Sequence, residues 1–284
     1  MPPRDAPTAR QARLGAELRK LREHAGKTAR ETAGLLGVDQ ARVSNIESGR
    51  MGISEERIRR LAAFYACADA DLIDALCAIA RERRGQFWWD GYRGLLPPAF
   101  LDIAELEHHA VRMRSLQALS IPGLFQTEAY ARALFNSAVP PFPPEEVDLR
   151  VEHRMRRRAI LEGEDPPRFD AIVHEAALRM RFGGRKVARA QLEHLMEIAQ
   201  WPHVTLRVVT FASENFVEVT QPVLYAAAVV PQLDTVQLDT PFGGCYLDAE
   251  AELRRHRMLL DIAQGLSLDV DESRRLIHDI ARDL

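Results

Sequence analysis

The stretch that decides the fold is TARETAGLLGVDQARVSNIESG, residues 28–49. Thr28 and Glu31 match a capping box, in which the hydroxyl and the carboxylate each accept from a backbone amide at the start of a helix. Gly37 ends that helix, because glycine readily adopts the left-handed conformation that closes helices. Asp39 is then placed to cap a second helix. Two short helices joined by a tight turn predict a helix-turn-helix.

The second helix of this pair has a small, polar outward face. Val43 and Ile46 are three residues apart, so they share the face that turns toward the core. The residues on or beside the opposite face are Gln40, Ala41, Arg42, Ser44, Asn45 and Ser48. Small side chains let a helix enter the major groove, where amide and guanidinium groups pair with base edges. The pattern predicts contact with double-stranded DNA, since a helix that packs on protein more often presents leucine or aromatic anchors.

Helical patterns continue on both sides of this stretch. A preceding helix is marked by leucines that recur at intervals of four and three residues up to Gly26, and two more helices are expected at about 54–65 and 71–84. Residues 1–9 contain three prolines and predict a flexible tail. We therefore expect an all-α five-helix domain over residues 10–84.

Charge is divided unevenly along the 284 residues. Residues 1–65 contain 13 Lys and Arg against 8 Asp and Glu, a net charge of +5, which leaves −8 for the remainder of a chain with net charge −3. The first part can neutralise phosphates and the remainder would repel them. The length is about twice that of a common domain, so two domains are expected.

Membrane insertion and secretion are not expected. The longest apolar run, residues 223–230, is far shorter than the roughly 20 residues of a membrane helix, and the chain start lacks a signal-peptide apolar segment. Cys67, Cys77 and Cys245 lack the spacing of a zinc site or a disulfide framework. These features favour a cytoplasmic protein with free thiols.

The composition changes at residues 85–98, where FWWDGY at 87–92 is followed by a pair of prolines. We interpret this segment as an aromatic linker whose rings pack at the seam between domains. Residues 99–284 then form the second domain. It is expected to begin with a helix at 101–119.

Most of the second domain combines helical patterns with β-branched runs, which predicts a mixed α/β fold. A helix between two of these runs predicts a βαβ crossover, and the later runs predict an antiparallel meander. Two helices are expected to end the chain. The predicted strands lie at 169–173, 204–209, 223–230, 235–238 and 245–247.

The first domain resembles the Xre/Cro-type repressors over about residues 10–68. The resemblance rests on the runs Leu18–Arg22, Leu36–Val38, Val43–Glu47 and Gly49-Arg50. It implies that Gln40, Ala41 and Asn45 read bases and that Thr28, Ala29 and Arg50 contact phosphates. It also implies a structural ion pair between Arg22 and Glu47. Two departures are Ala29, where the family often has glutamine, and Gly34, which costs about 1 kcal/mol inside a helix relative to alanine.

The second domain resembles that of the WhiJ-like, antitoxin-like regulators over roughly residues 96–280. The matching runs are at 121–131, 158–161, 165–167, 174–178, 183–184 and 191–195. Such regulators are often encoded beside a small protein, so the resemblance implies a small protein partner. A small-molecule effector is the other candidate, because a domain behind a helix-turn-helix commonly supplies a pocket. The candidate ligand or partner site is Gln126, Thr127 and Tyr130.

Patterns of enzyme active sites are incomplete. His174-Glu175 is followed by Leu178 where a zinc protease needs histidine, and His194 and Glu197 share a helix face without a third metal ligand in sight. The sequence contains no GxSxG, GxGxxG or P-loop pattern. We expect no catalytic residues, no metal and no cofactor.

Together these features predict a sequence-specific DNA-binding transcriptional regulator. One short recognition helix at 39–48 contacts few bases, so we expect a homodimer that places two such helices on a palindromic operator. The alternative is an antitoxin-type protein whose main role is to bind a small cognate partner, with DNA binding for autoregulation.

Overall fold

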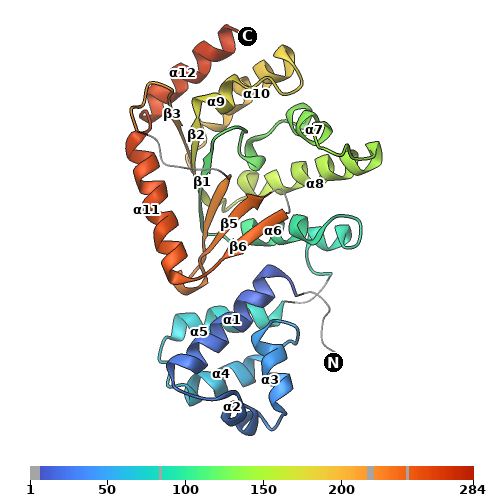
Figure 1. The fold of residues 1–284 in the computed structure, drawn as a ribbon, viewed down its shortest axis with the longest axis vertical. Helices are drawn as coiled ribbons and strands as arrows, with labels where there is room; N and C mark the ends of the chain where they lie inside the picture. Colours follow the sequence, from blue (N-terminus) through green and yellow to red (C-terminus); the bar gives the residue numbers. More distant parts are fainter. Residues whose placement is uncertain (1–6, 83–84, 216–220, 241–242) are drawn as a thin grey trace. The chain divides into compact units, whose positions relative to one another are not determined.

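The computed structural model describes residues 7–82, 85–215, 221–240 and 243–284 (Figure 1). The chain divides into two compact units. The first comprises Met1–His109 and Ala227–Asp234, and the second comprises Ala110–Ala226 and Thr235–Leu284.

The described part of the first unit begins with five consecutive α-helices, as the sequence predicts. A side chain caps the start of each one by accepting a hydrogen bond from a backbone amide in the first turn. These caps satisfy amides that a helix start otherwise leaves without a partner. The helices, each with its cap, are α1 (Ala9–His24, Thr8), α2 (Ala29–Leu36, Thr28), α3 (Gln40–Glu47, Asp39), α4 (Glu55–Phe64, Ser54) and α5 (Ala70–Arg81, Asp69).

Helices α1 and α3 approach each other closely at two glycines. A Cβ atom at Gly15 would lie 2.5 Å from the carbonyl oxygen of Glu47, well inside van der Waals contact. Gly49, just after α3, has a φ of +73°, and a Cβ atom there would lie 2.7 Å from the backbone nitrogen of Ala12. Glycine at both positions therefore lets the backbone of α1 contact the backbone at the end of α3.

Gly15→Ala should destabilise the protein by about 1 to 3 kcal/mol, because the added methyl group overpacks the contact between α1 and α3. Gly34→Ala is the matched control, since no heavy atom lies within 4 Å of the Cβ position of this residue in α2. Alanine there should stabilise the helix by about 1 kcal/mol. Urea unfolding followed by circular dichroism measures both changes, and equal stability of the two variants would contradict the close approach.

The aromatic segment packs inside the first unit. It forms the short helix η1 (Trp88–Tyr92), which leads to α6 (Pro98–His108). Phe87 stacks on Trp89 with ring centroids 4.5 Å apart, and both rings meet the imidazole of His108 edge to face. These rings therefore form part of the first unit's own packing.

The first unit also includes α6. The carboxylate of Asp102 on this helix accepts a hydrogen bond from the backbone amide of Ala9, at 3.1 Å, where the start of α1 favours a negative charge. The sequence analysis began the second domain at residue 99, after a linker at 85–98. The two compact units divide at Ala110, so α6 lies in the first unit.

The described part of the second unit contains a six-stranded mixed sheet in the order β3-β2-β1-β4-β5-β6. Strands β1, β2 and β3 are parallel, and β4, β5 and β6 pair antiparallel. Both the predicted crossover between β2 and β3 and the predicted meander are confirmed. The strands are β1 (Arg112–Gln117), β2 (Arg168–His174), β3 (Val204–Val209), β4 (Val223–Ala227), β5 (Thr235–Thr240) and β6 (Gly243–Leu247).

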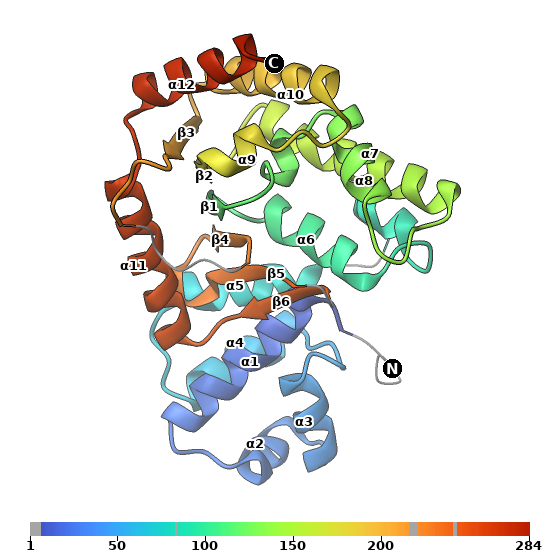
Figure 2. The ribbon, with the colours of Figure 1, turned by 45° about the horizontal axis from the view of Figure 1, so that its top comes forward.

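Helices lie on both sides of this sheet. Figure 2 shows α11 on one side and α7 and α8 on the other, as does Figure 1. Helices α9 and α10 form the crossover from β2 to β3. The helices of this unit are α7 (Glu128–Asn136), α8 (Pro144–Glu162), α9 (Glu175–Arg179), α10 (Arg185–Ile198), α11 (Glu250–Leu266) and α12 (Val270–Arg282).

The single helix predicted at 101–119 is wrong. Helix α6 ends at His108 and strand β1 begins at Arg112. Met113 and Leu116 are three residues apart, a spacing that fits one face of a helix, whereas in a strand the two side chains point to opposite faces. Their place in a central strand decides the outcome, because β1 pairs with β2 on one side and β4 on the other and buries both residues fully.

The connection between β4 and β5 belongs to the first unit. Val230 and Leu233 are buried in the core formed by α1 to α5. The backbone carbonyl of Gln232 accepts a hydrogen bond from Arg13 on α1, and its side-chain amide donates to the capping carboxylate of Asp69 at 2.8 Å. The core of the first unit is therefore completed by residues that follow it by more than a hundred positions in the sequence.

A search of the described helices finds none with the length and apolar character to cross a membrane.

Candidate nucleic-acid interface

The turn between α2 and α3 has the geometry that the sequence indicates. Gly37 adopts the left-handed conformation, with φ 64° and ψ 40°, and closes α2. Asp39 then accepts a hydrogen bond from the Arg42 amide at 2.6 Å and opens α3. Val43 and Ile46 are buried beneath α3, at 2% and 4% exposure. The opposite face of α3 is consequently held outward.

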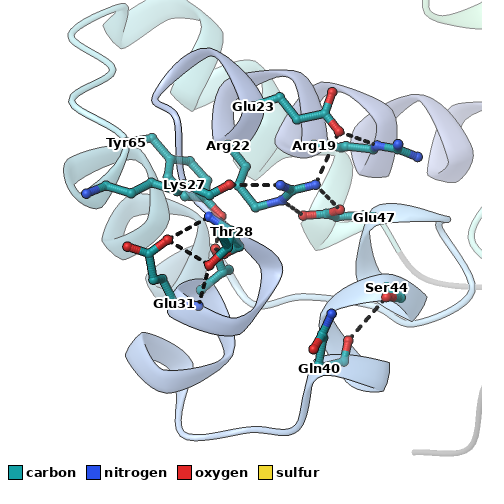
Figure 3. Close-up of polar contacts among 11 residues, drawn as sticks. Arg19, Arg22, Glu23, Lys27, Thr28, Glu31, Gln40, Ser44, Glu47 and Tyr65 are labelled. Carbon is teal, nitrogen blue, oxygen red and sulfur yellow. Dashed lines mark hydrogen bonds and ion pairs between the residues drawn. The ribbon is translucent and has the colours of Figure 1, made fainter.

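The outward face of α3 keeps its side-chain amides available. Gln40 is exposed and Asn45 is half-buried, and among the described residues neither side chain has a hydrogen-bond partner. The hydroxyl of Ser44 donates instead to the Gln40 carbonyl at 3.2 Å (Figure 3). The hydroxyl of Ser48 donates to the Asn45 carbonyl, also at 3.2 Å. The two amides are thus the groups of α3 best placed to bond a base edge.

Of the other residues predicted to contact DNA, Ala41 and Arg42 lie on α3, Arg50 follows α3, and Ala29 is the first residue of α2. Ala41 and Arg50 are exposed, while Arg42 and Ala29 are half-buried. The Nε atom of Arg42 is buried without a hydrogen-bond partner in the described structure. This part of the side chain therefore lies against the protein. Arg50 lies in the segment directly after α3, where the backbone nitrogen of Met51 bonds to the Asn45 carbonyl at 2.9 Å.

An ion pair fixes the end of α3 to the end of α1. The Arg22 guanidinium donates to both carboxylate oxygens of Glu47, at 2.6 and 3.0 Å, and to the Lys27 carbonyl at 2.9 Å (Figure 3). Both side chains are about nine-tenths buried. The hydrogen bonds to Glu47 raise the pKa of Arg22 above its usual value. The pair therefore joins α1, the segment before α2, and α3.

Glu47→Ala should destabilise the protein by about 3 to 5 kcal/mol, because it leaves the Arg22 guanidinium buried without its carboxylate. Glu23→Ala is the matched control, since the Glu23 side chain is 52% exposed and pairs with Arg19 and, at 3.4 Å, with Arg22, which keeps both of its hydrogen bonds to Glu47 in this variant. It should cost at most about 1 kcal/mol. Denaturant titration compares the two. Similar losses of stability in both variants would show that the buried ion pair contributes no more to folding than the exposed one.

Thr28 is engaged by its own helix. Its backbone amide and its hydroxyl both donate to Oε2 of Glu31, each at 2.7 Å (Figure 3). These hydrogen bonds lower the pKa of Glu31, so the carboxylate stays ionised. A phosphate at Thr28 would have to compete with this carboxylate. The amides of Ala29 and Arg30, which open α2, are the other donors at this helix start.

Arg30 is a candidate that the motif comparison did not single out. It is exposed in the first turn of α2, next to Thr28 and Ala29. A guanidinium there adds positive charge to a helix start that already favours anions. The excess of Lys and Arg in residues 1–65 was the sequence signal for such a residue, although charge counting does not locate it.

The structure brings Gln126, Thr127 and Tyr130 together in a bonded network. Gln126 is 2% exposed; its amide donates to the Ile121 carbonyl at 2.7 Å and its oxygen accepts from Arg154 at 2.7 Å. The Thr127 hydroxyl caps α7 at the Tyr130 amide, and the buried Tyr130 hydroxyl accepts from the Ile121 amide at 3.4 Å. Burial raises the pKa of Tyr130 to about 12. These contacts give all three a structural role, and their part in ligand binding stays a prediction.

The histidines considered for metal binding make other contacts. The ring of His174 accepts a hydrogen bond from the Ala176 amide at 3.1 Å and so caps α9. His194 lies between Arg158 and Glu197, with contacts of 3.3 Å to each. Within the described ranges, His, Cys, Asp and Glu side chains form no group of three that could hold a metal ion.

Comparisons with known proteins match two separate parts of the chain. Residues 13–76 match the model of a helix-turn-helix domain, which supports a DNA-binding regulator. Residues 100–279 match the family described as domain of unknown function DUF5753. That match covers more than half of the chain, and the chain therefore belongs to this family. Neither a curated protein nor a solved structure matches the chain.

Proposed function

We propose that the protein is a sequence-specific transcriptional regulator that binds a palindromic operator as a homodimer, with α3 in the major groove. The observation that carries the proposal is the outward face of α3. It presents the amides of Gln40 and Asn45, and its opposite face is anchored by Val43 and Ile46 in the core. A rigid helix with available amide groups is suited to reading adenine.

Phosphate contacts are assigned to the start of α2 and to Arg50. The helix start offers the amides of Ala29 and Arg30 together with the positive end of the helix dipole. Arg50 is exposed just beyond α3. Contacts of this kind set the register of α3 on the duplex without reading sequence. Two copies are required because one short helix contacts few bases.

Asn45→Ala and Gln40→Ala should each lose about 1 to 3 kcal/mol of discrimination between operator and random DNA, because each removes a base contact. Arg50→Ala should weaken binding to all sequences and flatten the salt dependence, since it removes a phosphate contact. The measurement is fluorescence anisotropy on the protein's own promoter region over a salt series, with random DNA as competitor.

Arg282→Ala serves as the control for these variants, because Arg282 is an exposed arginine of α12 in the second unit. It should leave the affinity for both DNAs unchanged. Equal effects of Asn45→Ala and Gln40→Ala on operator and random DNA would overturn the assignment of base contacts. An effect of Arg50→Ala that is confined to the operator would overturn the assignment of a phosphate contact. Wild-type binding that random DNA removes completely would overturn sequence-specific recognition.

Glu31→Gln should strengthen binding to every DNA sequence by about two- to fivefold, because it removes a negative charge beside the proposed phosphate site. Glutamine keeps the capping box, so the helix start is preserved. Glu56→Gln is the matched control, since Glu56 is an exposed glutamate in the first turn of α4. Weaker binding by Glu31→Gln, or the same gain in both variants, would place the phosphate elsewhere.

We assign regulation of DNA binding to the second unit, through a small protein partner or a small-molecule effector. Residues 66–284 carry a net charge of −8, which disfavours a direct role in phosphate contact. A regulator of this kind should bind its operator alone and change affinity when the ligand is added. An effector-regulated protein should bind its metabolite without the product of the neighbouring gene, whereas an antitoxin-type protein should form a stable complex with that product. Co-purification from the native host distinguishes these two.

A further inference from the structure

We propose that the exposed face of α11 is the self-association surface, on which a second copy of the chain packs its own α11 antiparallel about a two-fold axis near Met258. This inference rests on the homodimer of the proposed function and specifies the surface that forms it. It concerns the second unit alone.

Helix α11 has one buried face and one exposed apolar face. Leu253, Leu260 and Ala263 are buried on the side that packs across strands β1, β3 and β5. On the opposite side, Met258 is 59% exposed and Ile262 is 51% exposed. The two are four residues apart and therefore form one stripe. Burying such a stripe in water is favourable, at roughly 25 cal/mol for each Å² of apolar surface.

Small residues occupy symmetric positions of α11 on either side of Met258. In an antiparallel pair, a residue seven positions before Met258 faces one seven positions after it in the partner copy. These residues are Ala251 and Gly265, both exposed. Their small side chains leave room for the two helix backbones to approach at both ends of the contact. A two-fold interface repeats each such pairing twice, because the same patch serves both copies.

Charges on the rim of this face are also complementary. Arg254 lies on one flank of the stripe, one turn before Met258, and Asp261 lies on the same flank almost one turn after it. Antiparallel pairing sets Arg254 of each copy beside Asp261 of the other. Arg254 is exposed and has no ion-pair partner within the described part of its own chain. Asp261 pairs with Arg114 yet keeps 68% of its side chain exposed.

The size of the contact sets the expected strength. A helix of 17 residues is about 25 Å long, so a single pair of such helices forms a small interface. We expect dissociation in the micromolar range without DNA. An operator with two half-sites raises the effective concentration of the second copy and strengthens the pair on DNA.

Met258 offers the sharpest test, because only this register makes the residue face itself. Met258→Glu and Met258→Lys each place two like charges at the two-fold axis, and each should weaken self-association of the full chain by at least roughly tenfold. An equimolar mixture of the two variants should recover dimers, since the two charges then attract. Sedimentation equilibrium over a concentration series measures all three samples, and Arg275→Glu on α12 is the surface control.

A second pair of variants tests the rim. Arg254→Asp and Asp261→Arg should each dissociate as homodimers and associate when mixed, because both ion pairs re-form between the two chains. The Asp261→Arg variant loses the ion pair with Arg114, and circular dichroism checks that it remains folded. The Met258 variants leave that contact intact.

The possible results distinguish failure of the α11 surface from failure of the homodimer. If the wild-type chain is dimeric and both Met258 variants dimerise equally well, α11 is not the dimer surface, while the homodimer of the proposed function is retained. A wild-type chain that binds its operator while remaining monomeric would overturn both. A mixture of the Glu and Lys variants that associates no better than either one alone would also overturn the register. If the wild-type chain is monomeric and binds a small protein that the Met258→Glu variant no longer binds, the exposed face of α11 is the binding surface for that protein instead.

Discussion

The contact between α1 and α3 is the constraint on which the rest of the first unit depends. Gly15 and Gly49 bring the two backbones together, and the ion pair between Arg22 and Glu47 joins their ends. A helix of eight residues is too short to hold its own conformation in water. The outward face of α3 is presented in one orientation because the opposite face and both flanks are fixed to neighbours.

The helical core of the first unit and the sheet of the second unit are linked by the connection between β4 and β5. The connection between β4 and β5 supplies Val230 and Leu233 to the core of the helices, while the strands on either side of it belong to the sheet. Gln232 bonds both to Arg13 and to the cap of α5. The segment that the helical core requires is therefore continuous with two strands of the sheet.

Sequence reasoning was most successful where local chemistry is decisive. The caps Thr28 and Asp39, the turn at Gly37 and the inward pair Val43 and Ile46 depend on residues within a few positions of each other. The βαβ crossover was also readable, because β-branched runs flanked a periodic helix. The stretch at 101–119 was predicted as one helix because Met113 and Leu116 have helical spacing, and only the central place of β1 in the sheet buries both of its faces.

The sequence by itself determined that the chain has a helix-turn-helix with a small polar recognition face, followed by a mixed α/β region. It did so because capping, turn chemistry and periodicity act over short distances. Tertiary packing alone places residues 227–234 in the helical core, makes β1 a central strand of the sheet and leaves the stripe at Met258 exposed. Each of these depends on which groups meet or remain uncovered after folding, and burial is a property of the whole chain.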